Sequence, residues 1–297
     1  MISYRMLERF YLLGAEVRPN FPMKCATSLG IGGSVEALIV PNTLDSAREI
    51  IRMLNETGEK YRIMGFGTNL LVSDEGLEGA VIRTTNLGSF EIRGDLLVAE
   101  SGVPLKRLCL VALEHSLSGL EELFGIPGSL GGAVRMNAGA YGKEISEIIE
   151  WVELFDGNRA EKFSPDDLGM SYRNGGVGGR FVTRVALKLK RSSRDSIESA
   201  MKDFLARRIS RQPIFDRSAG SLFKRPRPDF YVGKAIEDLG LKGYRVGDVM
   251  ISEKHAGFMV NVGNGRFEDA LELIDEVKKA VMERHGVKLE TEVIIWR

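Results

Sequence analysis

The chain of 297 residues is long enough for two or three domains, and its 43% hydrophobic and 28% charged residues are typical of a globular protein with a full core. Lys and Arg together number 41, as do Asp and Glu, so the formal net charge is zero. This balance argues against nucleic acid or a charged membrane surface as a partner. No apolar run approaches the roughly 20 residues of a membrane-spanning helix.

The cysteines and histidines give no sign of a disulfide framework or a metal site. Cys25 and Cys109 stand far apart without CxxC spacing, and the three histidines fall at no metal-ligand spacing. We therefore expect reduced cysteines, no bound metal and a cytoplasmic location. Residues 1–17 lack the apolar core and cleavage site of a secretory signal and predict an amphipathic helix.

Hydrophobic periodicity predicts alternating strands and helices along the chain. Residues 43–58 predict a helix that ends at Gly58, and residues 104–119 a helix with Pro104 in its first turn. Residues 191–196 predict a linker. The other predicted helices are 197–209 and 266–286, and the predicted strands are 35–40, 61–65, 70–74, 79–85, 95–102, 151–158 (entering an Asp-Gly turn), 181–190 and 287–296.

The segment "GFGTNLLVSD" (65–74) contains a Gly-x-Gly turn. A dinucleotide-binding fingerprint needs a third glycine that opens a helix, whereas Leu70, Leu71 and Val72 continue as a strand. A Rossmann site is therefore disfavoured. Two interpretations stay open: a plain tight turn, or a nest of backbone N–H groups that binds a phosphate.

The segment "GIPGSLGGAVRMNAGAYG" (125–142) has six glycines. Each glycine inside a regular element costs roughly 0.5–1 kcal/mol relative to alanine, so this density needs a reason. A flat ring system or a pyrophosphate lying directly on bare backbone is one reason, and tight turns between crowded strands are the other. A second glycine-rich turn about 60 residues earlier favours one extended ligand that touches both.

Three further segments are less distinctive alone. Residues 208–226 are rich in arginine, which binds phosphates and carboxylates bidentately but is also common in solvated linkers. Residues 170–176 read "MSYRNGG". In the predicted terminal strand, Glu290 and Glu292 share one face, which usually meets only water.

Together these segments resemble the UDP-N-acetylenolpyruvoylglucosamine reductase (MurB) family, whose motifs recur in order over nearly the whole chain from about Lys24. The seven matching segments are "TSLGIGG" (27–33), 65–74, 125–142, "YR" (172–173), "SAGSLFKRP" (218–226), "LKGYRVGDVMISEKHAGFMVN" (241–261) and "GVKLETEV" (286–293).

The resemblance implies an α+β fold with two α/β FAD-binding subdomains, like those of vanillyl-alcohol oxidase (the PCMH type), and a C-terminal α+β substrate domain. The expected boundaries are 1–84, joined by the terminal strand 288–297, then 85–195 and 196–287. It further implies a cytoplasmic enzyme of peptidoglycan precursor synthesis, without membrane insertion or nucleic acid, and we expect a monomer.

The implied reaction reduces the enolpyruvyl group of a UDP-sugar to UDP-N-acetylmuramate. NADPH would reduce non-covalently bound FAD, whose N5 would pass a hydride to the double bond. The carried-over roles are proton donation for Ser221 and stabilisation of the enolate by Arg173 and Glu292. The expected FAD-binding residues are Gly65, Gly67, Thr68, Asn69, Leu70, Gly125, Ile126, Pro127, Gly128, Gly131, Gly132, Ala133, Asn137, Ala138 and Gly139, and the expected substrate-binding residues are Tyr172, Arg208, Arg211 and Lys224.

The chain departs from the family pattern in two places. Arg225 stands where an asparagine commonly follows the lysine of this motif, which puts a diphosphate contact in doubt. Asn174 stands where a serine commonly lies close after the tyrosine-arginine pair. The short connection from Arg173 to Phe181 resembles the subtype that lacks an inserted loop whose tyrosine closes over the substrate.

Two other functions are compatible with parts of the sequence. One is an alcohol or sugar oxidase on the same flavin-binding fold, although the histidines fit no flavin-tethering pattern and the C-terminal third matches the reductase. The other is a nucleotide-sugar-binding protein without catalysis, against which the joint presence of Ser221, Arg173 and Glu292 speaks. Oxygen consumption and bound FAD discriminate among the three.

Overall fold

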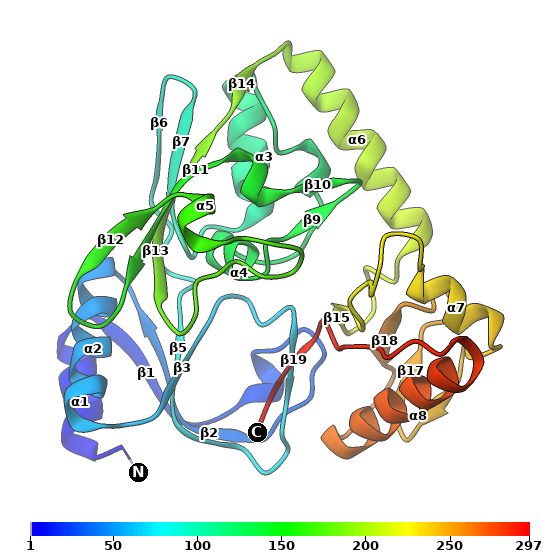
Figure 1. Ribbon diagram of the computed structural model, residues 1–297. Helices are drawn as coiled ribbons and strands as arrows, with labels where there is room; N and C mark the ends of the chain where they lie inside the picture. The colour runs from blue at the N-terminus through cyan, green and yellow to red at the C-terminus, as the bar shows by residue number, and fades with distance from the viewer. Residues whose placement is uncertain (1) are drawn as a thin grey trace. The chain divides into compact units, whose positions relative to one another are not determined.

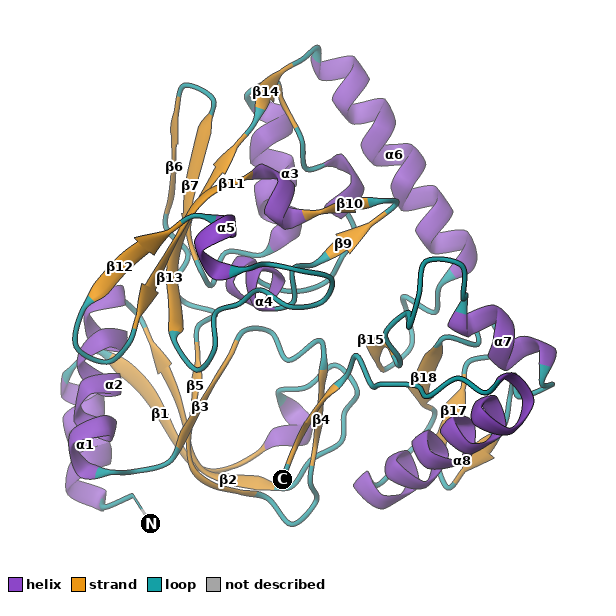
Figure 2. Cartoon of the chain, in the orientation of Figure 1, coloured by secondary structure: helices purple, strands orange, loops and turns teal. Residues whose placement is uncertain are grey.

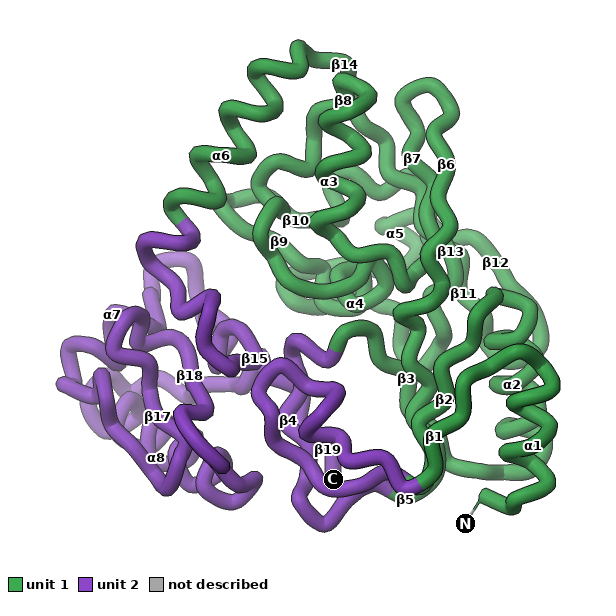
Figure 3. The backbone as a smooth tube through the Cα atoms, turned by 180° about the vertical axis from the view of Figure 1, so that it is seen from behind, with its two compact units in different colours: residues 1–19, 36–66, 78–207 green, residues 20–35, 67–77, 208–297 purple. Residues whose placement is uncertain are grey.

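The computed structural model describes residues 2–297, which form a mixture of helices and strands (Figures 1 and 2). This mixture confirms the expected α+β class. The chain divides into two compact units (Figure 3). The first holds residues up to Pro19, Glu36–Phe66 and Glu78–Arg207, and the second holds Asn20–Val35, Gly67–Leu77 and Arg208–Arg297. The three-domain division stays a prediction.

One layer of the first unit is a four-stranded sheet in the order β1-β2-β5-β3, packed with two helices around a common apolar core. Its elements are α1 (Tyr4–Leu12), β1 (Ala15–Pro22), β2 (Ser34–Pro41), α2 (Leu44–Thr57), β3 (Tyr61–Met64) and β5 (Leu77–Arg83). The sequence specifies α2 at both ends: the Thr43 hydroxyl accepts from the Ser46 amide, and Gly58 closes the helix at φ 69°. The helix predicted over 43–58 is confirmed.

The second layer of the first unit is an antiparallel five-stranded sheet in the order β12-β11-β13-β7-β6. The turn after β11 confirms the prediction, because the Asp156 carboxylate accepts from the amides of Asn158 and Arg159. This layer and its connections comprise β6 (Phe90–Arg93), β7 (Leu96–Glu100), α3 (Leu105–Glu114), β8 (Leu117–Ser118), α4 (Leu130–Arg135), β9 (Gly139–Ala140), β10 (Lys143–Glu144), β11 (Ile149–Phe155), β12 (Ala160–Phe163), α5 (Pro165–Leu168), β13 (Phe181–Lys188), β14 (Lys190–Arg191) and α6 (Arg194–Arg211), with short 3-10 turns at Glu121–Leu123 and Ile145–Ile148.

The second unit contains a four-stranded sheet in the order β15-β18-β17-β16 with two helices, and a separate parallel pair, β19-β4. Gly286 ends α8 in the left-handed conformation, as the sequence predicts. The unit comprises a 3-10 turn at Met23–Cys25, β4 (Leu70–Val72), β15 (Ser218–Ser221), α7 (Val232–Asp238), β16 (Arg245–Val246), β17 (Val249–Ile251), β18 (Phe258–Asn261), α8 (Phe267–His285) and β19 (Ile294–Trp296).

Three predicted elements are shorter or longer than expected. Helix α3 ends at Glu114, not at 119, because Ser116 takes a positive φ of 55° and Leu117 pairs with Arg191. The predicted linker 191–196 shrinks because α6 already begins at Arg194. The terminal strand shortens to β19 because its partner β4 has three residues.

Candidate active site

The two glycine-rich turns meet within the first unit. A Cβ added to Gly65 would lie 2.2 Å from Oγ of Ser129, whose side chain caps α4 by accepting from the Gly132 amide. Such a distance is impossible without movement, so a side chain at Gly65 would collide with the side chain of Ser129. The juxtaposition expected for a single ligand touching both turns is therefore present around Gly65 and Ser129.

The structure separates two reasons for glycine in residues 125–142. A Cβ on Gly131 would lie 2.7 Å from Cβ of Ser101, and one on Gly139 would lie 2.3 Å from the Lys143 carbonyl oxygen, so both glycines permit close packing of the protein itself. Gly132 differs: it is exposed, and within 4 Å a Cβ there would meet only the Ser129 hydroxyl, at 3.4 Å. Protein packing accounts for Gly131 and Gly139, and it does not account for Gly132.

These residues fit a flavin nucleotide. The Ser129 side chain leaves no room for a side chain at Gly65, and the exposed Gly132 leaves open backbone on which a flat ring can lie.

Asn137 fixes the second glycine cluster rather than facing outward. Its side chain is fully buried, donating to the Glu144 carboxylate at 2.7 Å and to the Ser171 carbonyl at 3.0 Å and accepting from the Ser146 amide at 3.1 Å. Both amide hydrogens are thereby used inside the protein. A contact from Asn137 to a ligand would have to come from its backbone.

Arg173 occupies a tight turn that lies against this cluster. Ser171 and Asn174 exchange two backbone hydrogen bonds of 2.9 Å, and Arg173 between them takes a positive φ of 55°. Such a conformation is uncommon outside glycine and marks a residue held by its surroundings. The guanidinium donates to the Gly139 carbonyl at 3.3 Å and lies 4.8 Å from the ring centre of the exposed Tyr172. The predicted pair 172–173 and the glycine stretch are therefore neighbours.

Ser221 ends a strand that contains a bulge. In β15, Ser218 pairs with Val260 and Ser221 with Phe258, so three steps on one strand oppose two on the other. Gly220 supplies the positive φ, 80°, that this irregularity needs. Bulges of this kind re-aim a side chain. Ser221 is partly exposed, and its hydroxyl has no hydrogen-bond partner among residues 2–297.

Glu292 lies on the segment next to Ser221, within the second unit. Its amide donates to the Leu222 carbonyl at 2.9 Å, and its own carbonyl accepts from the Asn69 side chain at 3.1 Å. Residues 291–293 form a bridge and two bends instead of the predicted strand, so alternation does not place Glu290 and Glu292 on one face. Backbone pairing nevertheless brings Glu292 beside the residue that follows Ser221.

The predicted substrate cations differ in their surroundings. Lys224 lies 3.6 Å from the exposed Glu290 carboxylate, and its amide donates to the Glu290 carbonyl. Arg208 is only 8% exposed and donates to the Gln212 side chain at 2.9 Å. Arg211 is exposed at the end of α6. Lys224 and Arg211 are thus better placed than Arg208 to meet an anion in solvent.

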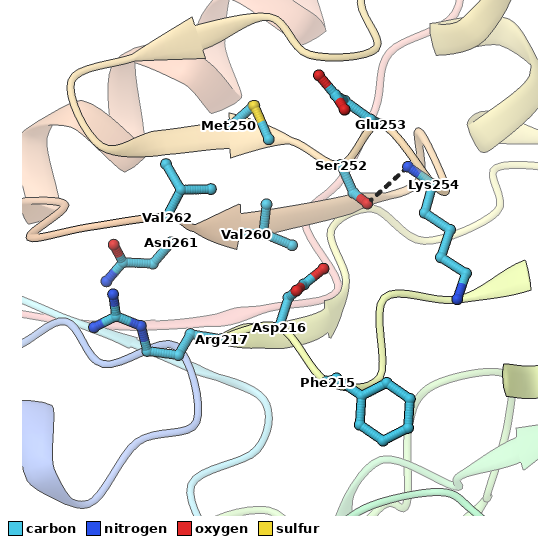
Figure 4. Close-up of a pocket in the computed structure, with 10 residues that line it drawn as sticks. All are labelled: Phe215, Asp216, Arg217, Met250, Ser252, Glu253, Lys254, Val260, Asn261 and Val262. Atoms are coloured by element: carbon cyan, nitrogen blue, oxygen red, sulfur yellow. Dashed lines mark hydrogen bonds between the residues drawn. The ribbon is translucent and has the colours of Figure 1, made fainter.

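A pocket of about 560 Å³ lies between the segment before β15 and the turn after β17 (Figure 4). This size is within the range of small-molecule sites. Phe215, which is 83% exposed, stands at its edge, and the Lys254 side chain donates to the Ile209 carbonyl at 2.6 Å. The lining residues are Phe215, Asp216, Arg217, Met250, Ser252, Glu253, Lys254, Val260, Asn261 and Val262. Sequence reasoning missed this pocket, and the local signal was an aromatic residue followed by the charged pair Asp216 and Arg217.

Metal and redox groups are few. Within residues 2–297 no cluster of three His, Cys, Asp or Glu side chains could hold a metal ion, and Cys25 and Cys109 are free thiols. Burial, together with the negative charge of Glu121, raises the pKa of the Cys109 thiol to about 12. None of the helices in residues 2–297 combines the length and apolar composition needed to cross a membrane.

Comparison with known proteins adds relatives over nearly the whole chain. Residues 212–296 match the family model for the UDP-N-acetylenolpyruvoylglucosamine reductase C-terminal domain, and residues 35–159 match the FAD binding domain. The chain is 48% identical to the UDP-N-acetylenolpyruvoylglucosamine reductase of a Thermotoga species, over 98% of this chain and 97% of the relative.

Two solved structures place the fold. The crystal structure of UDP-N-acetylenolpyruvylglucosamine reductase (MurB) from Thermus caldophilus matches with a TM-score of 0.82 and 37% identity, covering 95% of this chain and 99% of that chain. Berberine bridge enzyme matches with a TM-score of 0.50 and 17% identity, over 65% of this chain and 44% of that chain, which is a likeness of fold alone.

Proposed function

Because the chain belongs to the UDP-N-acetylenolpyruvoylglucosamine reductase (MurB) family, an FAD-binding oxidoreductase family of peptidoglycan precursor synthesis, we propose that Ser221, Arg173 and Glu292 carry its reaction. The substrate is the enolpyruvyl ether of UDP-N-acetylglucosamine, the product is UDP-N-acetylmuramate, and the electron donor is NADPH. The enzyme works in the cytoplasm. One observation supports the catalytic assignment above all: the Glu292 amide bonds to the Leu222 carbonyl, directly after Ser221.

FAD is held by the bare backbone around Gly65 and residues 125–139, with Gly132 as its open contact. The bound cofactor supplies the hydride that the double bond receives. Asn137 and Ser129 serve by fixing this backbone, since their side-chain groups are used within the protein.

Ser221 donates the proton that completes the reduction. A serine hydroxyl is a very weak acid, so it can act only where negative charge develops beside it. Its hydroxyl is unengaged by other residues of 2–297, and the bulge at Gly220 turns the strand just before it, which suits a group that must face a substrate. The serine regains its proton from solvent.

Arg173 and Glu292 stabilise the negative charge that the substrate carboxylate acquires. Arg173 does so by its charge, from a turn that packing holds rigid. Glu292 acts through its carboxyl group at the same substrate carboxylate.

The nucleotide part of the substrate is bound by groups of the second unit. Lys224 and Arg211 offer charge to the diphosphate, and the pocket beside Phe215 offers an exposed aromatic face with Lys254 near it for the base (Figure 4). Stacking on an aromatic ring and charge-assisted bonds are the contacts that nucleotides use.

The test separates the two half-reactions by stopped-flow absorbance of the flavin. In Ser221→Ala, reduction by NADPH should proceed at the wild-type rate, because the serine acts only afterwards. Reoxidation by the enolpyruvyl substrate should slow by about 10²–10⁴-fold, the usual contribution of general acid catalysis. Wild-type reoxidation in this variant would remove Ser221 from the mechanism, and equal slowing of both steps would show a structural role instead.

A further inference from the structure

His255 lies in the turn that joins β17 to β18. Its imidazole ring lies between Gly257 of the same turn and Gly233 of α7. A Cβ on Gly233 would lie 2.9 Å from its Cε1 atom, and a Cβ on Gly257 would lie 3.0 Å from the same atom. Neither glycine has a positive φ, so their backbone conformation does not call for glycine. The missing side chains are explained by the space that the ring occupies.

The ring makes one hydrogen bond that depends on its protonation. Nδ1 of His255 accepts from the Gly257 amide at 3.0 Å, and the ring edge packs against Phe258 with 5.1 Å between ring centres. A ring nitrogen accepts only when it carries no proton, so His255 must be neutral with its proton on Nε2.

Backbone hydrogen bonds link the Gly257 peptide to the segments that carry Ser221 and Glu292. The Gly257 carbonyl accepts from the Leu222 amide at 2.9 Å, and the Leu222 carbonyl accepts from the Glu292 amide at 2.9 Å. Ser221, just before Leu222, pairs with Phe258 across β15 and β18. One residue, Leu222, thus bonds through its amide to the turn and through its carbonyl to Glu292, next to Ser221, and His255 fixes the turn side of this chain of bonds.

We propose that His255 is a positioning residue for the proton-transfer step: its neutral ring holds Gly257, and through the Leu222 peptide it keeps Ser221 and Glu292 in register. The inference rests on the proposed function of these two residues. His255 itself is not placed in contact with substrate or cofactor.

Burial, more than the neighbouring charges, sets the pH at which this contact fails. Half-burial lowers the pKa of His255 below its ordinary 6.5, and a backbone hydrogen bond at His255 opposes this shift. The charge of Lys242 lowers the pKa by a smaller amount, and that of Glu237 raises it. The two charged groups pair with each other at 2.7 Å on the α7 side, and Glu253 and Lys254 are the charged residues of the turn itself. The ring is therefore neutral at pH 7. Acid protonates Nδ1, and its new N–H group then faces the N–H group of Gly257 instead of accepting from it.

The test compares two variants of similar size. His255→Asn places an amide oxygen close to the position of Nδ1 and does not titrate, whereas His255→Leu offers no acceptor. We expect reoxidation by substrate at pH 8 to be near the wild-type rate in His255→Asn and about three- to tenfold slower in His255→Leu, the loss expected for one neutral hydrogen bond. Flavin reduction by NADPH should be unchanged in both. His285→Asn, which alters an exposed ring packed edge-on against Phe230, is the matched control.

Two further readouts separate positioning from a merely structural role, and the second of them, amide hydrogen exchange, does not depend on turnover. The wild type should lose reoxidation rate as the pH falls below 6.5, and His255→Asn should not show this limb. Amide hydrogen exchange at Leu222 and Gly257 should be faster in His255→Leu than in His255→Asn.

Equal behaviour of the Asn and Leu variants, or equal loss in both half-reactions, would overturn the inference. A slow Ser221→Ala variant beside a wild-type-like His255→Leu variant would sink the role of His255 alone. Normal reoxidation in Ser221→Ala would remove the proposed function, and this inference with it.

Discussion

Gly132 offers a test in which cofactor binding and folding respond in opposite directions. The residue lies in α4, and a Cβ there meets only the Ser129 hydroxyl at 3.4 Å, close to ordinary contact. Replacing glycine by alanine inside a helix gains about 0.8–1.0 kcal/mol. Gly132→Ala should therefore leave the apoprotein as stable as the wild type, or slightly more stable.

The same methyl group removes the space that a ring lying on this backbone would use. Atoms in contact lie about 3.5–4.0 Å apart, and a Cβ projects about 1.5 Å from Cα, so a ring in contact with the Gly132 backbone would have to retreat by a comparable distance. A gap of only about 0.5–1 Å already forfeits a quarter to a half of the dispersion energy. We expect FAD affinity to fall at least tenfold in Gly132→Ala and further in Gly132→Val.

Gly131 is the matched control, one residue earlier in the same helix. A Cβ there would lie 2.7 Å from Cβ of Ser101, so Gly131→Ala overpacks the core at a cost of about 1–3 kcal/mol, against the same gain in helix propensity. Thermal unfolding of the apoprotein and FAD titration followed by flavin fluorescence separate the two effects. Wild-type FAD affinity in Gly132→Val would refute the assignment of this backbone to the cofactor.

Two other predictions concern a carboxylate pair and a thiol pair. Glu292→Gln keeps the shape of the side chain but removes its acidic proton, so reoxidation by substrate should slow at least tenfold with FAD content unchanged. Glu290→Gln breaks only an exposed ion pair and should slow it less than twofold; equal loss in both variants would indicate a structural role for the segment. At pH 8 a thiol reagent should label Cys25 but not Cys109 in the native protein, because burial raises the pKa of Cys109 to about 12. Both thiols should be labelled after unfolding. Labelling of both thiols in the native protein would contradict the burial of Cys109.

The sequence predicted those helices whose ends are determined by residues next to them in the chain. Thr43 and Gly58 bound α2 by capping chemistry that the sequence alone specifies. The predicted end of α3 was wrong because Leu117 leaves the helix to pair with Arg191, more than 70 residues away. A strand partner at that distance has no counterpart in a window of neighbouring residues.

In the candidate site too, features set by neighbouring residues could be predicted, and features set by residues distant in the sequence could not. The glycine-rich stretch was recognisable, but its two interpretations could be separated only when the atoms facing each glycine were known: Ser101 for Gly131, Lys143 for Gly139 and open space for Gly132. The packing interpretation holds for Gly131 and Gly139, and the ligand interpretation stays a prediction for Gly132. The sequence shows how many glycines the stretch contains, but only the structure shows which atoms lie next to each glycine.

His255 shows why a positioning residue escapes sequence reasoning. Judged by metal-ligand spacing, it is one of three unremarkable histidines. The position of the His255 ring depends on Gly233, which belongs to another element. Its proposed effect on Ser221 and Glu292 depends on the Leu222 amide, 33 positions earlier in the chain. Glu292 is the same kind of case, since the backbone of Leu222, and not strand alternation, brings it beside Ser221. If these backbone bonds set the reaction geometry, substitutions at His255 should change the rate of proton transfer without touching the proton donor, which neither residue's local sequence could have indicated.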